Sequence, residues 1–212
     1  MTTGITDPEQ GPLKHIVLDD SIQRLLFLDA RSATKFSPDP IPDEMIREVY
    51  ELIRWAPTGN NSIPLRLVLA KSSESRASVI ATAHENNRPK LERAPLIVVV
   101  ARDDRFHDFF PVTSPGSESG QLHLENAPAE RTTKAHDGTL IQLGYLIVGL
   151  RAAGLSVRPY GGFSRKALDE LLLSDTSWHS EVLLGIGFPA GEDHGAGPRR
   201  NRLEWSQAAK IR

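Results

Sequence analysis

The sequence predicts an α+β fold in which a sheet of roughly four strands is built around buried helices. One reason is the order of its segments, which runs helices, strand, helix, strand, helix, helix, strand. A second is the run of apolar and β-branched side chains at residues 94–101, which is typical of a strand buried on both faces. A third is the segment 137–153, which is apolar on nearly every side, as expected of a helix covered by a core or by another subunit.

The composition indicates a single domain with a tail. The chain has 212 residues, of which 39% are hydrophobic, so it can form one sizeable core. Its formal net charge of −2 gives no electrostatic reason to expect nucleic acid or a membrane surface as a partner. The absence of cysteine excludes disulfides, thiolate metal sites and a cysteine nucleophile. We expect residues 1–17 to be a flexible tail and residues 18–212 to form one domain.

The sequence carries no signal for export or membrane insertion. Residues 1–20 include several acids and lack the apolar segment of a signal peptide. The longest apolar run is far too short to span a membrane. Together with the lack of cysteine, these features lead us to expect a cytoplasmic protein.

The first half of the chain predicts three helices and a strand. The first helix begins near Asp20, and either Asp19 or Asp20 can cap it. The second covers residues 43–55, with acids in its first turn, and stops at Pro57 because the residue before a proline disfavours the α conformation. Residues 65–70 alternate as a strand does, and a charged helix follows over residues 75–84.

The second half begins with its least regular part. Residues 103–135 show no sustained period and predict a long excursion, and such segments often form lids or binding loops. The apolar helix 137–153 follows, with Tyr145 and its neighbours expected in a core or an interface. A serine-capped helix is expected over residues 165–173, and the last strand over residues 182–188.

The loop between the second helix and the first strand is rich in turn-forming residues. Its sequence, Ala-Pro-Thr-Gly-Asn-Asn-Ser-Ile-Pro-Leu at residues 56–65, contains more of them than a simple reversal needs. The Thr, Asn and Ser side chains could present hydrogen-bond donors to an anionic or polar ligand. The alternative is a helix cap followed by an ordinary loop.

Several familiar motifs are absent. The Gly185-Ile-Gly187 segment follows an apolar strand, but Pro189 and the residues after it provide no helix on which a dinucleotide pyrophosphate could sit. The sequence has no phosphate-binding P-loop, GxSxG nucleophile elbow or HExxH zinc motif. Its 7 histidines have no metal-ligand spacing, and we expect each on the surface or in a loop.

Four stretches remain as candidates for a binding site. Two are cationic, at residues 31–32 and 199–202, and two, at 58–61 and 159–162, are turns that contain glycine. This combination suits a ligand with a phosphate at one end and a flat polar ring at the other, in which the ring supplies the chemistry and the protein supplies position.

In order and spacing, these stretches resemble the FMN-dependent nitroreductase family. The matching segments are Arg31-Ser-x-x-x-Phe36, Ala56-Pro-Thr-Gly-Asn-Asn61-x-x-Pro64, Ala94-Pro-Leu-Ile-Val-Val, Ala153-Gly-Leu155, Pro159-Tyr-Gly-Gly-Phe163 and Gly185-Ile-Gly-Phe-Pro189. The resemblance is closest to the malonic semialdehyde reductase-like branch, which has a similar Asp-Ala-Arg start and Arg-x-x-Arg-Leu ending. It implies a central, mostly antiparallel sheet of about four to five strands surrounded by helices, in a dimer with a buried central helix.

The resemblance also implies where FMN is held. Arg31 and Ser32 match the N-terminal segment that contacts the phosphate and ribityl chain. Arg200 and Arg202 match the C-terminal phosphate clamp, and Arg199 is the alternative to Arg200.

Contacts to the flavin ring are implied in three places. One loop would reach the flavin that is bound mainly by the other subunit, a second segment would meet the pyrimidine side, and a third would approach N5. The residues are, in that order, Pro57, Thr58 and Asn61; Asn87 and Lys90; and Tyr160, Gly161 and Gly162.

The sequence departs from the family pattern at four positions. Thr34 stands where many members have a basic residue that meets the flavin and nicotinamide phosphates, and we keep it as a candidate contact. Ile63 replaces a frequent Gln, Leu65 a frequent Trp, and Arg158 precedes the Pro-x-x-Gly turn where the branch usually has Gly. The preferred nicotinamide and the substrate therefore stay open.

We therefore expect a homodimeric flavoprotein that uses FMN and either NADH or NADPH in a ping-pong reaction. The acceptor would be a small aldehyde, nitro compound, quinone or enone, and Lys90 could stabilise negative charge on the flavin. No metal and no protein base are required. Two alternatives remain: an oxidase or desaturase that reduces O₂, and a flavin-binding protein without catalysis.

Overall fold

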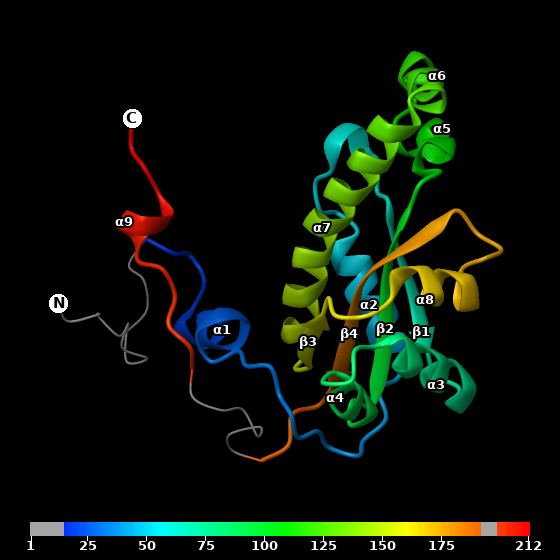
Figure 1. The fold of residues 1–212 in the computed structure, drawn as a ribbon. Coiled ribbons are helices and arrows are strands. Elements are labelled where there is room, and N and C mark those ends of the chain that lie inside the picture. The colour runs from blue at the N-terminus through cyan, green and yellow to red at the C-terminus, as the bar shows by residue number, and fades with distance from the viewer. Residues whose placement is uncertain (1–14, 192–198) are drawn as a thin grey trace.

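A four-stranded antiparallel sheet lies at the centre of the fold, with strand order β1-β2-β4-β3 (Figure 1). The computed structural model describes residues 15–191 and 199–212, so most of the expected tail lies outside the described residues. The α+β class and the roughly four strands that the sequence predicts are confirmed. The strands are β1 (Leu65–Ala70), β2 (Leu96–Asp103), β3 (Ser156–Tyr160) and β4 (Trp178–Gly187).

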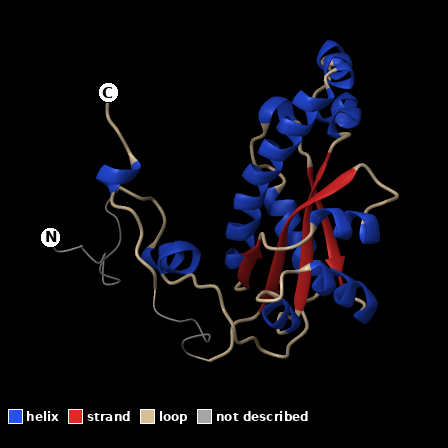
Figure 2. Cartoon of the chain, in the orientation of Figure 1, coloured by secondary structure: helices blue, strands red, loops and turns tan. Residues whose placement is uncertain are grey.

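Helices cover both faces of this sheet, as the cartoon shows (Figure 2). On one face α2 and α7 pack against Leu96, Val98 and Val100 of β2. On the other, α3, α4 and α8 pack against Ile97 and Val99. The prediction that this strand is buried on both faces is therefore confirmed. The covering helices are α2 (Asp43–Ile53), α3 (Ser73–Thr82), α4 (Arg88–Glu92), α7 (Pro128–Ala152) and α8 (Arg165–Leu172).

The last strand begins four residues earlier than the sequence predicts, at Trp178 instead of residue 182. Its extra residues include His179, Ser180 and Glu181, whose polarity hides the strand pattern. They pair with the end of β2 through a register shift between Val100 and Ala101. Ion pairs compensate the burial of Glu181, which contacts Arg102 and His136, and His179 contacts Asp169.

The expected loop excursion at residues 103–135 is wrong, because the segment is largely helical. It contains η3 (Phe106–Phe109), α5 (Phe110–Thr113), α6 (Glu118–Asn126) and the first turns of α7. A small core of its own holds it together, made by Phe106, Phe110, Leu124 and Ala135. Because α6 buries a single residue, its sequence lacks the repeating apolar positions that indicate an amphipathic helix.

His107, in the same segment, is a second correction, because it is fully buried and not a surface or loop histidine. Its Nε2 atom lies 2.8 Å from Glu125 Oε2 on α6. This contact and Arg105 lower the pKa of the Glu125 carboxyl. The pair therefore fastens η3 to α6.

Helix α7 is longer than predicted, and within one chain it is covered on one side only. It is 25 residues long and begins at Pro128. Only one side is buried: Leu140, Ile141 and Tyr145 are 42%, 46% and 47% exposed, which contradicts a helix covered on all sides within one chain. We call Leu140, Ile141, Gly144 and Tyr145 the open face of α7; they stand at adjoining positions on one side of the helix.

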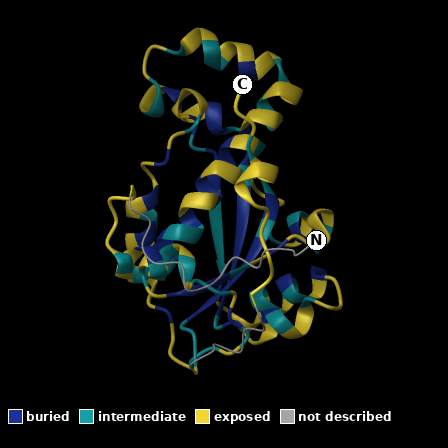
Figure 3. Ribbon diagram, turned by 90° about the vertical axis from the view of Figure 1, so that its left-hand side faces the viewer, coloured by how far each residue is buried: buried dark blue, intermediate teal, exposed yellow. Residues whose placement is uncertain are grey.

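The terminal segments also expose apolar side chains. The N-terminal part forms α1 (Asp20–Gln23) and the π-helical turn η1 (Arg24–Leu28), and the C-terminal part includes α9 (Trp205–Ala208). Both lie outside the helices that cover the sheet (Figure 1). The first helix forms as predicted, but Leu25 and Phe27 around it are 47% and 51% exposed, and Trp205 is 75% exposed. Figure 3 shows the contrast with the buried strands.

Within the described part of the chain, no helix combines the length and the apolar character needed to cross a membrane.

Gly149 allows α2 and α7 to approach closely, and we expect its replacement to destabilise the fold. A Cβ atom there would lie 2.6 Å from Ile53 Cγ2 and 3.1 Å from Val49 Cγ1, on β-branched side chains that cannot easily turn away. Gly149→Ala should lower the free energy of unfolding by about 1–3 kcal/mol in denaturant titration. A Cβ atom at Gly120 in α6 would lie no closer than 4.0 Å to another side chain. Gly120→Ala should therefore raise the free energy of unfolding by roughly 0.5–1 kcal/mol. Equal effects of the two substitutions would contradict this account of the packing.

Candidate functional site

Strand β3 forms one edge of the sheet and connects two of the predicted stretches. At its start, the Ser156 hydroxyl donates to Arg31 O at 3.0 Å and accepts from Ala33 N at 2.9 Å, which fixes the N-terminal segment. At its end stand Gly161 and Gly162. The strand has 5 residues, which at ~3.3 Å each span about 16 Å. This edge therefore offers an elongated site with a different group at each end.

A hollow of about 160 Å³ marks the start of β3. Its lining residues come from the N-terminal segment, the end of α7, the start of β3 and the chain after β4. They are Leu25, Asp29, Ala30, Arg31, Arg151, Gly154, Leu155, Ser156 and Pro189.

Three arginines gather around this hollow. Arg31 and Arg151 line it. Arg151 Nη1 donates to Leu26 O at 2.9 Å, and the Arg199 guanidinium donates to Leu28 O next to the lining residues. Burial lowers the pKa of Arg151, and the positive charge of Arg199 lowers it further. An anion bound between these guanidinium groups would offset both effects.

Arg151 was not among the residues that the sequence singles out. It occupies the last turn of an otherwise apolar helix, one turn before Gly154. A cation there also suits the carboxyl end of a helix dipole, so the position alone does not reveal a ligand role. Only the folded chain brings it next to Arg31.

The other residues predicted to contact the phosphate are neighbours of Arg31 or Arg199 in the sequence, and none of them lines the hollow. Arg202 Nη1 donates to the carbonyls of Arg200 and Asn201 at 3.0 and 3.1 Å, within its own segment. Arg200 and Ser32 are exposed, and Thr34 is partly buried. Of the three C-terminal arginines, Arg199 is the one that contacts the N-terminal segment beside the hollow.

The turn after β3 forms the other end of the site. Gly162 O accepts from Asn87 Nδ2 at 3.1 Å and from His84 N at 3.0 Å, so the fold brings Asn87 and the turn together. A Cβ atom on Gly162 would lie 2.8 Å from Asn87 Nδ2, so this contact leaves no room for a larger residue at position 162. Lys90 follows in α4 and is partly buried.

The amide groups of this turn point to a ligand. Within the part of the chain that the structure describes, the N–H groups of Gly161 and Gly162 have no protein acceptor. Gly161 is exposed, and a Cβ atom there would meet nothing within 4 Å. Two successive amides at an open position can donate to a polar group that lies against the edge of the sheet.

Tyr160 belongs to the core more than to this open turn. It is 6% exposed and packs with the residues under α3 and α8. Burial raises the pKa of its hydroxyl, an effect that Arg158 and Arg93 partly oppose. The Arg158 guanidinium lies 5.6 Å from the centre of the Tyr160 ring. Arg158 therefore has a partner within the fold.

The loop that carries Pro57, Thr58 and Asn61 lies at the opposite edge of the sheet. It precedes β1, and three strand spacings of ~4.8 Å separate β1 from β3, or about 14 Å. Thr58 Oγ1 accepts from Ile63 N at 3.2 Å, and Asn61 Nδ2 donates to Thr113 O at 2.5 Å in α5. Within one chain, this loop is not brought to the turn after β3.

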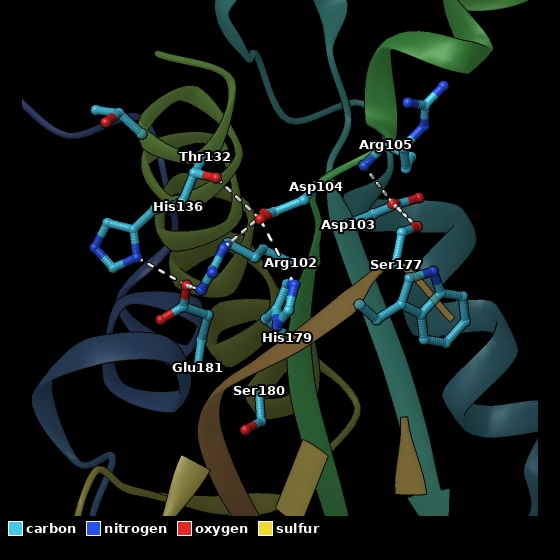
Figure 4. Close-up of polar contacts among 12 residues, drawn as sticks. Arg102, Asp103, Asp104, Arg105, Thr132, His136, Ser177, His179, Ser180 and Glu181 are labelled. Atoms are coloured by element: carbon cyan, nitrogen blue, oxygen red, sulfur yellow. Dashed lines mark hydrogen bonds and ion pairs between the residues drawn. The ribbon is translucent and has the colours of Figure 1, made fainter. Parts of the chain in front are cut away.

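A polar network that the sequence does not reveal joins the ends of β2 and β4 to α7 (Figure 4). Arg102 donates to Asp104 at 2.8 Å and to Glu181 at 2.7 Å. Glu181 also contacts His136 Nδ1 at 2.9 Å, and Asp104 accepts from the Thr132 hydroxyl at 3.0 Å. These groups satisfy one another, so the network serves the fold.

Among the described residues, His107, Asp108 and Glu125 are close enough together to hold a metal ion. Arg105 already pairs with both carboxylates, at 2.9 and 3.0 Å. A cation therefore compensates their charge without a metal.

Comparison with known proteins adds to this geometry. The nitroreductase family model matches residues 28–188, which include Arg31, the Pro57–Pro64 loop and the turn after β3 but not the C-terminal arginines. A Streptomyces coelicolor protein, provisionally named an NADH dehydrogenase/NAD(P)H nitroreductase, is 35% identical over 181 residues, or 85% of this chain and 89% of that protein.

Two solved structures share the fold. One, from Exiguobacterium sibiricum and described as a nitroreductase in complex with FMN, has a TM-score of 0.73 at 18% identity, covering 96% of this chain and 99% of that chain. The other, from Staphylococcus epidermidis and described as an NAD(P)H:FMN oxidoreductase, has a TM-score of 0.73 at 17% identity, covering 94% and 100%. At these identities the two structures support the fold alone.

Proposed function

Because the chain belongs to the nitroreductase family, we propose that it is an FMN-dependent oxidoreductase that uses NADH or NADPH. It would pass their reducing equivalents to a small aldehyde, nitro compound, quinone or enone in two half-reactions. The observation that carries the proposal is the edge strand β3, with a cationic hollow at one end and two amides without protein acceptors at the other.

The phosphate of FMN fits the hollow at the start of β3. A phosphate monoester carries nearly two negative charges at neutral pH. Arg31, Arg151 and Arg199 would hold it, because Arg31 and Arg151 line the hollow, Arg199 contacts Leu28 beside it, and a bound anion would offset the burial of the Arg151 charge and its repulsion by Arg199. Ser32 and Thr34, on the same segment, would contact the phosphate or the ribityl chain.

The ring of FMN fits the turn after β3. The amides of Gly161 and Gly162 would donate to its polar edge, and Asn87 and Lys90 would meet its pyrimidine side. FMN, when bound, supplies the electron chemistry, so no protein side chain has to act as nucleophile or base. The chain orients the substrate against the ring, and the Lys90 ammonium offsets negative charge that develops there.

We also propose that the protein works as a homodimer. The open face of α7 and the apolar side chains of the terminal segments need cover, and exposed apolar surfaces of this kind mark interaction sites. A partner chain would also resolve the position of Pro57, Thr58 and Asn61, which one chain keeps at the far edge of the sheet. In a dimer this loop would reach the FMN of the other subunit.

Within the family, the residues favour the malonic semialdehyde reductase-like branch. The supporting features are the start Asp-Ala-Arg-Ser at residues 29–32 and the ending Arg199-x-x-Arg202-Leu203. Arg158, where that branch usually has Gly, is partly buried beside the ring end of the site. It would favour an acceptor that carries negative charge.

The purified protein should be yellow, and the chromophore released by denaturation should be FMN and not FAD. The cationic hollow suits a terminal phosphate, and the chain lacks a dinucleotide fingerprint. Absorbance and chromatography of the released flavin test this directly. A colourless protein that does not bind added FMN would contradict the proposed function.

A further inference from the structure

We propose that Arg66 is the positioning residue of the Pro57–Pro64 loop: its guanidinium holds Ile63 in a left-handed conformation and ties the loop to buried Asp103. Arg66 stands in β1 and lies outside the residues that we assign to FMN. The inference rests on the proposed function in one respect, because it concerns the loop that we expect to reach the flavin of the other subunit.

The loop has an unfavourable backbone conformation that something must maintain. Asn60, Asn61 and Ile63 have φ angles of 55°, 50° and 44°. Asparagine tolerates this left-handed region, but isoleucine, with its branched Cβ, is strongly disfavoured there. Strain of this kind persists where the surrounding structure imposes it, which is most often at ligand sites.

The groups on both sides of Ile63 hold it in place. Its amide donates to Thr58 Oγ1 at 3.2 Å. Its carbonyl accepts from Arg66 Nη1 at 2.9 Å, and the same nitrogen donates to Leu65 O at 2.9 Å. Arg66 therefore fixes the carbonyls of Ile63 and Leu65, on either side of Pro64, where the loop turns into the strand.

Asp103 fixes Arg66 in turn. Arg66 Nη2 lies 2.7 Å from Asp103 Oδ2, and the two side chains are 18% and 3% exposed. The other carboxylate oxygen of Asp103 accepts from Arg105 N at 2.8 Å and from Ser177 Oγ at 2.6 Å, contacts drawn in Figure 4. A buried carboxylate with this many donors is rigid, so the guanidinium is held in one orientation.

The Arg66 guanidinium also contacts aromatic rings of η3, in the helical segment after β2, and of β4. It lies 5.1 Å from the centre of the Phe109 ring and 6.0 Å from that of Trp178. Asn61 adds a second link through its hydrogen bond to Thr113 O. A planar guanidinium can stack on rings while it donates to two carbonyls and a carboxylate, and a lysine ammonium cannot do all three.

Arg102 provides a matched control. It stands on the neighbouring strand at the same end of the sheet, its side chain is 17% exposed, and it pairs with Glu181, which is 4% exposed. Its contacts are with Asp104 and Glu181, and none reaches the Pro57–Pro64 loop. Arg66→Met removes the buried ion pair with Asp103, and Arg102→Met removes two ion pairs, with Asp104 and Glu181. Only the first substitution also removes a contact with the loop.

Hydrogen exchange of the apo-protein tests the proposal without any ligand. The hydrogen-bonded loop amides are Asn61, Ser62 and Ile63. In Arg66→Met they should exchange about tenfold faster or more than in the parent, whereas in Arg102→Met they should keep their parent rates. Arg66→Lys, which can still pair with Asp103, should also accelerate exchange in the loop while losing less thermal stability.

The outcomes separate this inference from the proposed function. FMN affinity, measured on the same proteins, should fall about tenfold or more in Arg66→Met and change little in Arg102→Met. If the parent binds no FMN, the proposed function fails, but the loop exchange rates still decide the role of Arg66. Unchanged loop exchange in both Arg66 variants, or an equal rise in Arg102→Met, would overturn the proposal.

Discussion

Replacing Arg199 with alanine should weaken FMN binding by about ten- to hundredfold and leave riboflavin binding nearly unchanged. A charge-assisted hydrogen bond of roughly 1.5–3 kcal/mol is lost when the guanidinium is removed, and this corresponds to the stated range. Riboflavin lacks the phosphate, so the same substitution removes no contact from it. Fluorescence titration of the apo-protein with each flavin gives the two dissociation constants.

Arg200→Ala is the matched control for this prediction. Arg200 follows Arg199 in the same exposed segment, but Arg199 is the one that contacts Leu28 beside the hollow. The alanine at residue 200 should therefore change FMN affinity much less. Equal losses for FMN and riboflavin in Arg199→Ala would mean that Arg199 supports the fold. A selective loss only in Arg200→Ala would place the phosphate nearer to that residue.

Introducing a charge on the open face of α7 should separate the subunits and abolish tight FMN binding. Ile141 is 46% exposed in one chain, so Ile141→Glu should not disturb the protomer. In a dimer the same carboxylate would be buried without a partner, which is strongly unfavourable. Because we propose that the loop at Pro57 contacts the FMN of the other subunit, we expect the monomer to bind FMN at least about a hundredfold more weakly.

Leu171→Glu controls for the effect of a new surface charge. Leu171 is 56% exposed on α8, on the other side of the sheet from α7. Light scattering should show a dimer for this variant and for the parent, and a monomer for Ile141→Glu. A parent protein that is a stable folded monomer at low micromolar concentration would contradict the dimer.

The regular elements could be predicted because their signals are local. Helix α2 begins at Asp43, as the acidic first turn indicates, and ends at Ile53, two residues before the expected end. Strand β2 is apolar throughout its centre because both of its faces are covered. Ser164 accepts from Ala167 N and caps α8 at the predicted place.

Elements that depend on distant partners could not be predicted. The first part of β4 is polar, and Glu181 tolerates burial only because Arg102 and His136 reach it from other elements. Helix α6 has one buried side chain and depends on contacts with η3, such as that between Glu125 and His107. The two residues of each contact are 18 or more positions apart in the sequence, so a local pattern cannot reveal them.

In the candidate site, too, the parts with a local sequence signal could be predicted and those that depend on distant contacts could not. Short motifs located the turn at Gly161 and the segment at Arg31, and the fold places them at the two ends of one strand. Arg151 was not predicted, because a single arginine at the end of an apolar helix has several roles that sequence does not distinguish. The separation of the Pro57 loop from β3 follows from the strand order, which the sequence does not specify.

Anaerobic titration of the purified protein with NADH and with NADPH, followed by its visible spectrum, tests the central claim most directly. We expect at least one nicotinamide to bleach the bound flavin completely, and a quinone or nitro compound added afterwards to restore the colour. Bleaching by an organic substrate without nicotinamide would identify an oxidase or desaturase instead. A bound flavin that neither nicotinamide reduces would contradict the assignment of this chain as an NAD(P)H-dependent oxidoreductase.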